Sequence, residues 1–386
     1  MTAGRHRRRY SFPMSSRSVR LASCLLVIVA VAVVGLTQVP AGASGPHTAT
    51  ISVSGKSYTP KAVNGATDDY HCTLIDPHLK HSAYIVSSQF FPNSVEVHHA
   101  ILSLVLPQDA ARARTTDHNG KGWTCFGESA LPSGRFGNAL ANSGWLTVWV
   151  PGQGLDPEPA GTGMLVPAGS LLIEQIHYNL LKGDKPVHAS VTLHTVPSSA
   201  HLQPLTIHIQ PAAPDVPCPA GVTGPLCDRT AALADLGKRF GPGAVVETQV
   251  IEAICGRNPT DPPVGVSTTC VRPAEPGRKI LRITPHMHLT GSSMQVVLNP
   301  GTPSAKTLVD DPHYNFDDQR FFNLKTPIVT HEGDTIAVTC TYNPKLRQQL
   351  PQLRKQPAKF ITWGDGSSDE MCLAIMQSVK APQAAA

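Results

Sequence analysis

Short apolar stretches rich in β-branched residues recur along this chain, and proline and glycine residues separate them. Stretches of this length between turn residues are typical of the strands of β-sandwiches and barrels. No long stretch has the period of an amphipathic helix. We therefore predict an all-β fold, with strands over residues 82–88, 95–105, 145–150, 170–178, 190–196, 279–284, 294–298 and 335–342.

One helix is expected, over residues 229–239, in a proline-rich and cysteine-bearing stretch that we interpret as an insertion at about residues 212–275. Near Pro197 a strand-like run gives way to Pro-Ser-Ser-Ala and repeated prolines, which is typical of a linker. The region after the leader has about 340 residues, more than a single core usually supports. We therefore expect two domains, 45–197 and 198–380, and a disordered tail at 381–386.

The N-terminal residues have the order of a signal peptide. Six arginines and no acidic residue precede an apolar run at 21–36, and the small-residue sequence Ala41-Gly42-Ala43 follows it. The run is shorter than the roughly 20 residues that a membrane-spanning helix needs. We therefore predict a signal peptide at 1–43, a secreted or extracytoplasmic location, and a mature form without a membrane segment. The alternative is an uncleaved N-terminal anchor.

Removal of this leader changes the charge argument. All six of its arginines are lost, which takes the formal net charge from +5 to −1. A near-neutral mature chain with few aromatic residues has no broad positive surface for nucleic acid. We therefore do not expect DNA or RNA as a partner.

Eight cysteines remain once Cys24 of the leader is removed, an even number that fits disulfides in an oxidising compartment. No two are spaced as Cys-x-x-Cys, which argues against a zinc ribbon. Spacing alone does not determine the pairing. The short loops from Cys218 to Cys227 and from Cys255 to Cys270 are the natural local pairs.

Two histidine pairs stand out among the histidines. His98 and His99 interrupt a strand-like segment, and because neighbouring strand residues face opposite sides, both can reach one metal only through a bulge or through different ring nitrogens. His286 and His288 are two residues apart, so on a strand they project from the same face and can share a metal without distortion. The alternative for the second pair is a half-exposed strand face.

A single later residue accompanies each pair. His177 lies 78 residues after His99, and Met371 lies 83 residues after His288. This layout suits two consecutive antiparallel β-sandwich domains of jelly-roll type, in which strands remote in sequence are adjacent in space. Taken singly, His177 could be a core histidine and Met371 an ordinary core residue.

Taken together, these segments resemble the copper type II, ascorbate-dependent monooxygenases, the family of dopamine β-hydroxylase and peptidylglycine hydroxylating monooxygenase. The resemblance covers most of the mature chain, and four motifs fall in the family's order and approximate spacing. They are His98-His99, Gln175-Ile176-His177-Tyr178, His286-Met287-His288-Leu289-Thr290-Gly291 and Asp369-Glu370-Met371-Cys372. Two linking segments, 311–314 and 333–343, resemble the dopamine β-hydroxylase branch more than the peptide branch.

The resemblance implies two copper ions, one that transfers electrons and one that binds O2. Their ligands would be His98, His99 and His177 for the first copper and His286, His288 and Met371 for the second. The donor sets agree with this division, because a thioether favours Cu(I), the state that meets O2, whereas three imidazoles suit a copper that cycles between Cu(I) and Cu(II). Ascorbate would be the reductant, O2 the co-substrate, and the reaction hydroxylation of a C–H bond in a small organic substrate.

The resemblance also implies roles for residues around the ligands. Tyr70 matches a family tyrosine close to the first copper, and Gln175 beside His177 is a second supporting residue. Disulfides would join Cys72 to Cys125 and Cys340 to Cys372, and the second would clamp the strand that carries Met371.

The chain departs from the peptide branch at the positions that surround the second ligand set. That branch has an arginine before its His-x-His and an asparagine and a tyrosine after its Met-Cys, where this chain has Thr284, Leu373 and Ile375. Capture of a peptide carboxylate is therefore not expected. The alternative function is a non-catalytic extracytoplasmic copper-binding or carrier protein, although the methionines here are dispersed. A purely structural pair of sandwiches would not explain why the four motifs occur together.

Overall fold

The computed structural model describes residues 48–118, 120–126, 131 and 144–382, and these residues belong to one compact unit. The predicted signal peptide and residues 383–386 of the predicted tail lie outside the described residues. No helix in the described part of the chain has the length and apolar character needed to cross a membrane.

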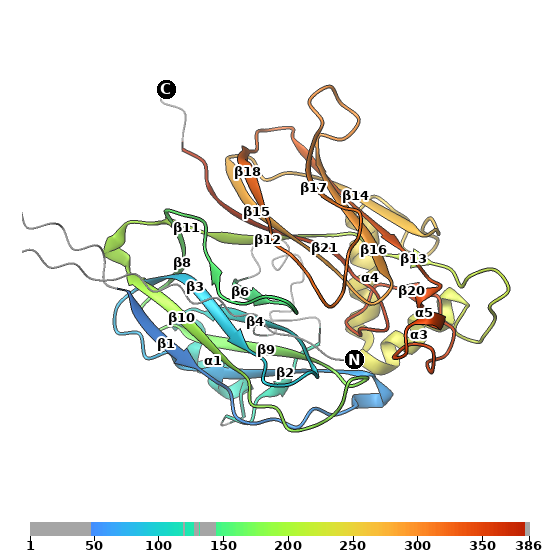
Figure 1. The fold of residues 1–386 in the computed structure, drawn as a ribbon, viewed down its shortest axis with the longest axis horizontal. Coiled ribbons are helices and arrows are strands. Elements are labelled where there is room, and N and C mark those ends of the chain that lie inside the picture. The colour runs from blue at the N-terminus through green and yellow to red at the C-terminus, as the bar shows by residue number, and fades with distance from the viewer. Residues whose placement is uncertain (1–47, 119, 127–130, 132–143, 383–386) are drawn as a thin grey trace, which may run out of the picture. The chain divides into compact units, whose positions relative to one another are not determined.

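The strands of the first half form two sheets (Figure 1). One has the order β1 (Ala49–Val53), β10 (Ser190–Pro197), β3 (Ala83–Phe91), β8 (Thr162–Val166) and β11 (Gln203–Pro204), with β7 (Asp156–Pro157) also paired to β3. The other has the order β5 (Trp123–Thr124), β2 (Asp68–Ile75), β9 (Leu171–Asn179), β4 (Val97–Val105) and β6 (Trp145–Trp149). Side chains from both sheets share one apolar core, so they pack as a sandwich.

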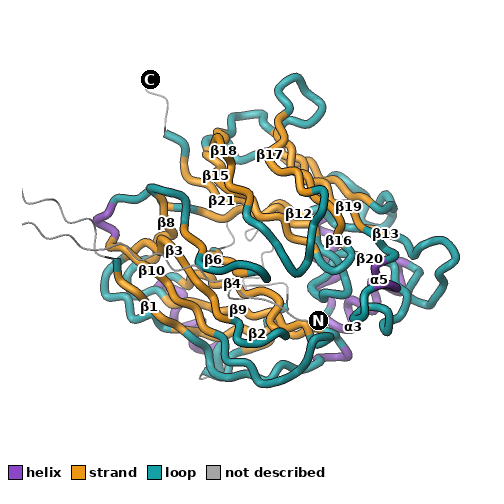
Figure 2. Tube along the Cα trace, viewed as in Figure 1, coloured by secondary structure: helices purple, strands orange, loops and turns teal. Residues whose placement is uncertain are grey.

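The second half repeats this arrangement. One sheet has the order β12 (Thr206–Pro211), β21 (Cys372–Lys380), β15 (Arg278–Met287) and β18 (Phe322–Val329). The other has the order β14 (Ser267–Pro273), β19 (Thr335–Tyr342), β16 (Gly291–Leu298) and β17 (Lys306–Asp311). A two-stranded ribbon joins β13 (Asp215–Val216) to β20 (Ile361–Thr362). Figure 2 shows that strands dominate over helices, and most neighbouring strands are antiparallel, so the predicted all-β fold is confirmed.

Strand β21 is buried on both of its faces. Cys372, Ala374 and Met376 point into the core of the second sandwich, whereas Leu373 and Ile375 belong to the apolar cluster that fills the first. This follows from the alternation of side chains along a strand. Met371, the residue before β21, also belongs to the first cluster.

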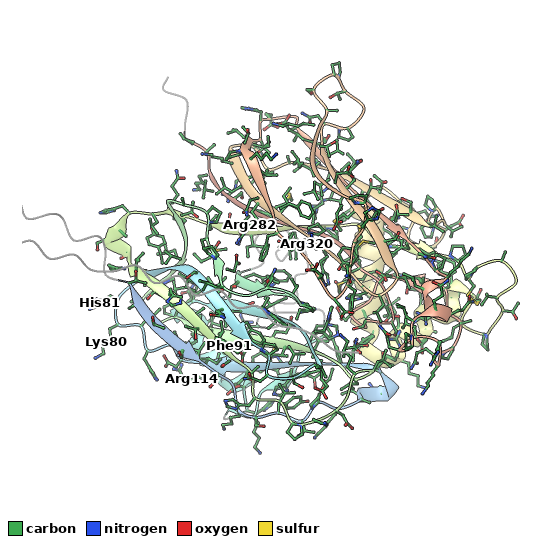
Figure 3. The ribbon with its side chains drawn as sticks, viewed as in Figure 1. Lys80, His81, Phe91, Arg114, Arg282 and Arg320 are labelled. Carbon is green, nitrogen blue, oxygen red and sulfur yellow. A yellow bond between two sulfur atoms is a disulfide. The ribbon has the colours of Figure 1, made fainter. Side chains whose placement is uncertain are left out.

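Arg282 of β15, labelled in Figure 3, makes a polar connection to the first half of the chain. Its guanidinium donates to Asp156 Oδ1 at 2.6 Å and to Glu158 Oε2 at 3.1 Å. All three side chains are largely buried. A buried guanidinium with two carboxylates forms short, directional bonds, so this contact specifies how the two sandwiches pack.

The insertion carries two helices, not the single one expected. The predicted helix is confirmed as α3 (Arg229–Phe240), where the Asp228 side chain accepts from Ala231 N and Gly241, at a φ of 90°, ends the helix. Helix α4 (Pro242–Ile254) was missed, because its β-branched residues have low helix propensity. Proline at its first position and a buried face at helical spacing outweigh that propensity.

The eight predicted strands are all present, as β3, β4, β6, β9, β10, β15, β16 and β19. Strand β2 was missed because Asp68, Asp69 and His71 break its apolar pattern. Both aspartates are buried and hydrogen-bonded, Asp68 to His177 and Asp69 to Tyr58. The predicted boundary near Pro197 falls at the end of β10, and the two-domain division stays a prediction.

Short elements complete the described chain: the helices α1 (Ala110–Thr116) and α5 (Leu346–Gln349) and the 3-10 turns Val63–Gly65, Pro107–Asp109 and Ser198–Ala200. Four disulfides are present, Cys72–Cys125, Cys218–Cys227, Cys255–Cys270 and Cys340–Cys372. These are the two local pairs and the two pairs that the resemblance implied. Four disulfides indicate an oxidising, extracellular environment.

Candidate metal centre

A β-bulge in β4 brings His98 and His99 together on one side of the strand. Val97 is paired with Tyr178 of β9, but the next paired residue is His99, opposite His177, so His98 is the extra residue of the bulge. A bulge re-aims side chains that would otherwise point to opposite faces. The two imidazole centroids lie 5.3 Å apart.

His177 lies between two strands that each contribute a ring beside it. It is opposite Tyr70 of β2 and opposite His99 of β4. The Tyr70 ring stacks on His177 with centroids 4.1 Å apart, and the His99 and His177 centroids are 4.7 Å apart. Because directly paired residues share a face of the sheet, the three side chains form one row across it.

The second histidine pair is at the end of β15. His286 is the penultimate residue of the strand and is paired with Leu373 of β21, and His288 directly follows the strand. The last pair of the two strands joins Met287 to Cys372, so His288 and Met371 are the residues that directly adjoin this pair. His286 and His288 are two residues apart, the spacing that on a strand places side chains on one face.

The five histidine rings form a single group. The His98 centroid lies 6.3 Å from those of both His286 and His288, and the His99 centroid is 5.5 Å from that of His286. The His286 and His288 centroids are 5.3 Å apart. Residues from the two sandwiches, nearly 200 positions apart in the sequence, thus meet at one place.

Six nitrogen atoms of this group are buried without a hydrogen-bond partner. They are Nδ1 and Nε2 of His98, Nδ1 and Nε2 of His288, Nδ1 of His99 and Nδ1 of His177. Leaving buried polar atoms unsatisfied costs free energy, so a concentration of them needs an explanation. Imidazole nitrogens are good copper and zinc ligands, and this donor set therefore fits a metal.

Asp68 and Gln319 each hold one histidine ring in a fixed orientation through a hydrogen bond. Asp68 Oδ1 lies 2.9 Å from His177 Nε2, and Gln319 Oε1 lies 2.8 Å from His286 Nδ1. Gln319 is itself oriented by its Nε2, which donates to Phe316 O at 3.2 Å. Both oxygens accept, so each ring nitrogen carries its hydrogen there, and the other nitrogen of each ring is the one that can face a metal.

Burial keeps four of the five rings neutral. Desolvation, and then the neighbouring imidazoles, lower the pKa values of His98, His99 and His288 well below the usual value. Desolvation lowers the pKa of His286 to about 4, although the hydrogen bond with Gln319 acts to raise this pKa. Neutral imidazoles are the form that binds metal, so the lone pairs are available at neutral pH.

Among the described residues, no three or more His, Cys, Asp or Glu side chains are already placed as the ligands of one ion. The rings are near one another, but binding of a metal by three of them requires some of the rings to turn. The grouping of the rings does not by itself divide them into two sets of three ligands.

Met371, Tyr70 and Gln175, the other predicted site residues, have different surroundings. Met371 is buried, and its backbone oxygen lies 3.4 Å from Tyr342 Oη. Tyr70 is buried beside His177, with its hydroxyl donating to Asp365 O at 2.9 Å. Gln175 faces the Cys72–Cys125 disulfide instead, donating from Nε2 to Cys125 O at 3.0 Å. Gln175 therefore supports the strand that carries His177.

Four residues around the rings were not singled out from the sequence. Phe316 stacks on His98 with centroids 3.9 Å apart. Glu370 accepts hydrogen bonds from the backbone nitrogens of His288 and Thr290. Asp68 and Gln319 complete the set. No local motif marks Phe316, Asp68 or Gln319, whereas Glu370 lies in the Asp369-Glu370-Met371-Cys372 motif, although no role was predicted for it.

One part of the chain matches a known protein family. Residues 265–380 match the family model described as "Copper type II ascorbate-dependent monooxygenase, C-terminal domain". The match supports that family. It covers less than a third of the chain, including His286, His288 and Met371, and it supports a copper- and ascorbate-dependent monooxygenase kind of function.

Similarity to solved structures is weak. An allantoicase structure has 10% identity and a TM-score of 0.18, with 83% of this chain and 80% of that chain covered. The infectious bursal disease virus VP2 subviral particle has 8% identity and a TM-score of 0.21, with 88% and 73% covered. At these TM-scores neither similarity carries an argument about fold or function.

Proposed function

We propose that this protein is an exported two-copper monooxygenase that hydroxylates a C–H bond of a small organic substrate with O2 and an ascorbate-like reductant. The observation that carries the proposal is the group of five buried imidazoles with six unpartnered nitrogens. The family match over the segment with His286, His288 and Met371 supports copper as the metal.

We assign the ligands by the sandwich from which they come. His98, His99 and His177 of the first sandwich would hold one copper, and His286, His288 and Met371 of the second would hold the other. When bound, the two ions would supply one-electron chemistry for the activation of O2. Three protein ligands leave a position open for oxygen at the second ion.

The protein residues prepare this chemistry in three ways. Asp68 and Gln319 accept hydrogen bonds from His177 Nε2 and His286 Nδ1, which leaves His177 Nδ1 and His286 Nε2 to face a metal. Tyr70 and Phe316 pack against the rings and limit their rotation. The surrounding burial excludes water from the group.

Copper content and oxygen consumption test this proposal together. Purified protein is loaded with copper and incubated with ascorbate, O2 and a panel of arylalkylamines, phenols and capped peptides. The expected result is O2 uptake that depends on substrate, and a product heavier by one oxygen atom. Copper binding without substrate-dependent turnover would instead favour a carrier, and protein that binds no copper would overturn both functions.

A further inference from the structure

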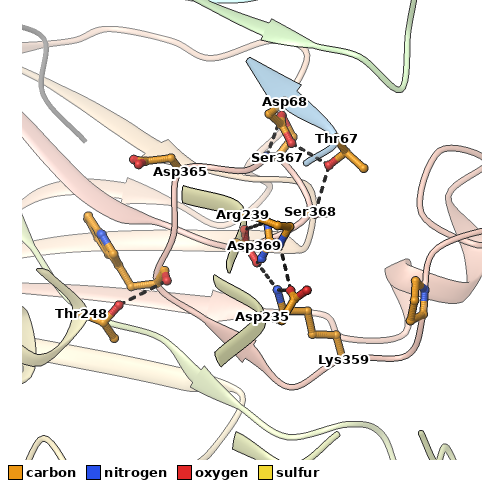
Figure 4. A network of polar contacts seen from close by, with 12 residues as sticks. Thr67, Asp68, Asp235, Arg239, Thr248, Lys359, Asp365, Ser367, Ser368 and Asp369 are labelled. Carbon is orange, nitrogen blue, oxygen red and sulfur yellow. Dashed lines mark hydrogen bonds and ion pairs between the residues drawn. The ribbon is translucent and has the colours of Figure 1, made fainter. Parts of the chain in front are cut away.

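Residues 364–370, which we name the strap, lead directly into Met371. The strap is a closed loop, because Gly364 N donates to Glu370 O at 3.1 Å and Glu370 N donates to Thr362 O at 3.1 Å. Figure 4 shows that several of its residues belong to one polar network. The network extends from the strap to α3 of the insertion and to β2 of the first sandwich.

Asp369 attaches the strap to the insertion. Arg239, near the end of α3, donates to both carboxylate oxygens of Asp369, at 2.7 and 2.8 Å, and Lys359 Nζ donates to Oδ1 at 2.5 Å. The Asp369 side chain is fully buried, and Asp235 bonds to both cations on their other side. Two-pronged contacts between arginine and carboxylate fix orientation as well as distance.

Two glycines allow the strap to lie against α3. A Cβ added at Gly366 would be 2.8 Å from Asp369 Oδ2 and 3.2 Å from Arg239 Nη1. A Cβ added at Gly364 would be 2.5 Å from Leu236 Cδ1. At 2.8 and 2.5 Å a Cβ at either position would force its neighbours to shift, so the lack of a side chain at these two glycines permits the close approach.

The opposite side of the strap is attached to β2. Ser367 N donates to Asp68 Oδ1 at 2.9 Å, the same oxygen that accepts from His177. Tyr70, which stacks on His177, donates its hydroxyl to Asp365 O. The strap therefore contacts the residues that orient His177, while its last residue, Glu370, holds the backbone of His288 and Thr290.

We propose that Arg239 is a positioning residue for Met371, and that the insertion serves to hold the strap in place. The inference rests on the proposed function, in which Met371 is a copper ligand. Arg239 and Lys359 fix Asp369, Asp369 fixes the strap, and the strap fixes the next residues, Glu370 and Met371. Removing Arg239 leaves Asp369 hydrogen-bonded to the point charge of Lys359, and the two-pronged contact is lost.

The test compares two arginines of the same helix. Arg239→Met removes the contact with the strap, whereas the control Arg229→Met removes a buried contact with Asp215 at the other end of α3. Each protein is loaded with Cu(I), and X-ray absorption measures the sulfur scattering shell around copper. We expect Arg239→Met to lose most of this shell and Arg229→Met to keep it. Arg239→Lys, which keeps the charge, should retain part of it.

A second pair of variants changes no charge and keeps the inference testable if Arg239→Met does not fold. Gly366→Ala should push the strap away from α3 and weaken the sulfur shell, whereas Gly243→Ala, where an added Cβ meets no atom within 4 Å, should not. A wild-type protein without a sulfur shell would refute the ligand assignment of the proposed function. A wild-type shell that persists in Arg239→Met or Gly366→Ala, or that is lost equally in the controls, would refute the role of the strap.

Discussion

His177 donates a hydrogen bond from Nε2 to Oδ1 of Asp68 at 2.9 Å, and both side chains are fully buried. Burial opposes the charged form of Asp68, but the interaction with His177 and the bonds from Ser367 outweigh it and hold the pKa of this carboxyl below its usual value. Asp68 is therefore a carboxylate acceptor. The only nitrogen that His177 can then offer to a metal is Nδ1, which has no other partner.

Asp68→Asn should weaken copper binding by the first histidine set. An amide can donate as well as accept, so it no longer enforces the tautomer of His177. Loss of such an outer-shell partner typically costs about 10- to 100-fold in metal affinity. Competition with a chelator of known affinity measures the change.

Asp69→Asn is the matched control for this experiment. Asp69 is the next residue of β2 and is also buried, but it accepts from Tyr58 Oη and Lys61 N. Its substitution should leave the copper affinity close to that of the wild type. Equal losses in the two variants would mean that Asp68 acts only through the stability of β2.

The strands and the histidine motifs could be predicted from sequence because their signals are local. The alternation of side chains implied that His98 and His99 could share a metal only through a bulge or through different ring nitrogens, and the structure has the bulge. Asp68 could not be found in this way, because 109 residues separate it from His177. Nor does any local pattern reveal that the histidines of the two sandwiches meet in one group, since that depends on how the sandwiches pack.

Glu174 should make the stability of the protein depend on pH. Desolvation raises its pKa from 4.5 to about 7, and although Gly55 N donates to Oε2, Oε1 has no partner. Because the folded state holds this proton more tightly than the unfolded state, stability falls as pH rises through the window from about 4.5 to 7 and is constant above it.

Glu174→Gln should remove that dependence, because glutamine is neutral at every pH in the window. The variant should therefore gain stability relative to the wild type toward alkaline pH, approaching about 3 kcal/mol. Denaturant unfolding at about pH 5 and about pH 8 measures the difference. A difference between the two proteins that does not grow with pH would show that Glu174 is ionised in the folded state.

The double variant His98→Ala with His99→Ala should bind one copper where the wild type binds two. The ligands of the second set remain, and Glu370 still holds the backbone beside His288. Elemental analysis of folded protein gives the stoichiometry, and circular dichroism checks the fold. Loss of both metals from the folded double variant would contradict this prediction. Because the five rings lie in one group, that result would indicate one shared metal site in place of two separate sites.

Met371→Ile separates the roles of the two ligand sets. Isoleucine has a similar apolar volume, and at this buried position such an exchange often costs less than about 1.5 kcal/mol, so the fold should persist. The soft thioether is lost, and with it the preference of the second site for Cu(I). Hydroxylation should collapse. Ascorbate should still reduce the copper held by His98, His99 and His177, which is measured as loss of the Cu(II) paramagnetic signal.

The reciprocal variant His177→Ala completes the comparison. It should keep copper at His286, His288 and Met371 but slow the supply of electrons, because the first set loses the ligand that Asp68 orients. The two variants should therefore both lose turnover, while only Met371→Ile retains reduction of the first copper by ascorbate. Near-normal hydroxylation by Met371→Ile, on a substrate that the wild type converts, would exclude this methionine as a ligand of the oxygen-binding copper.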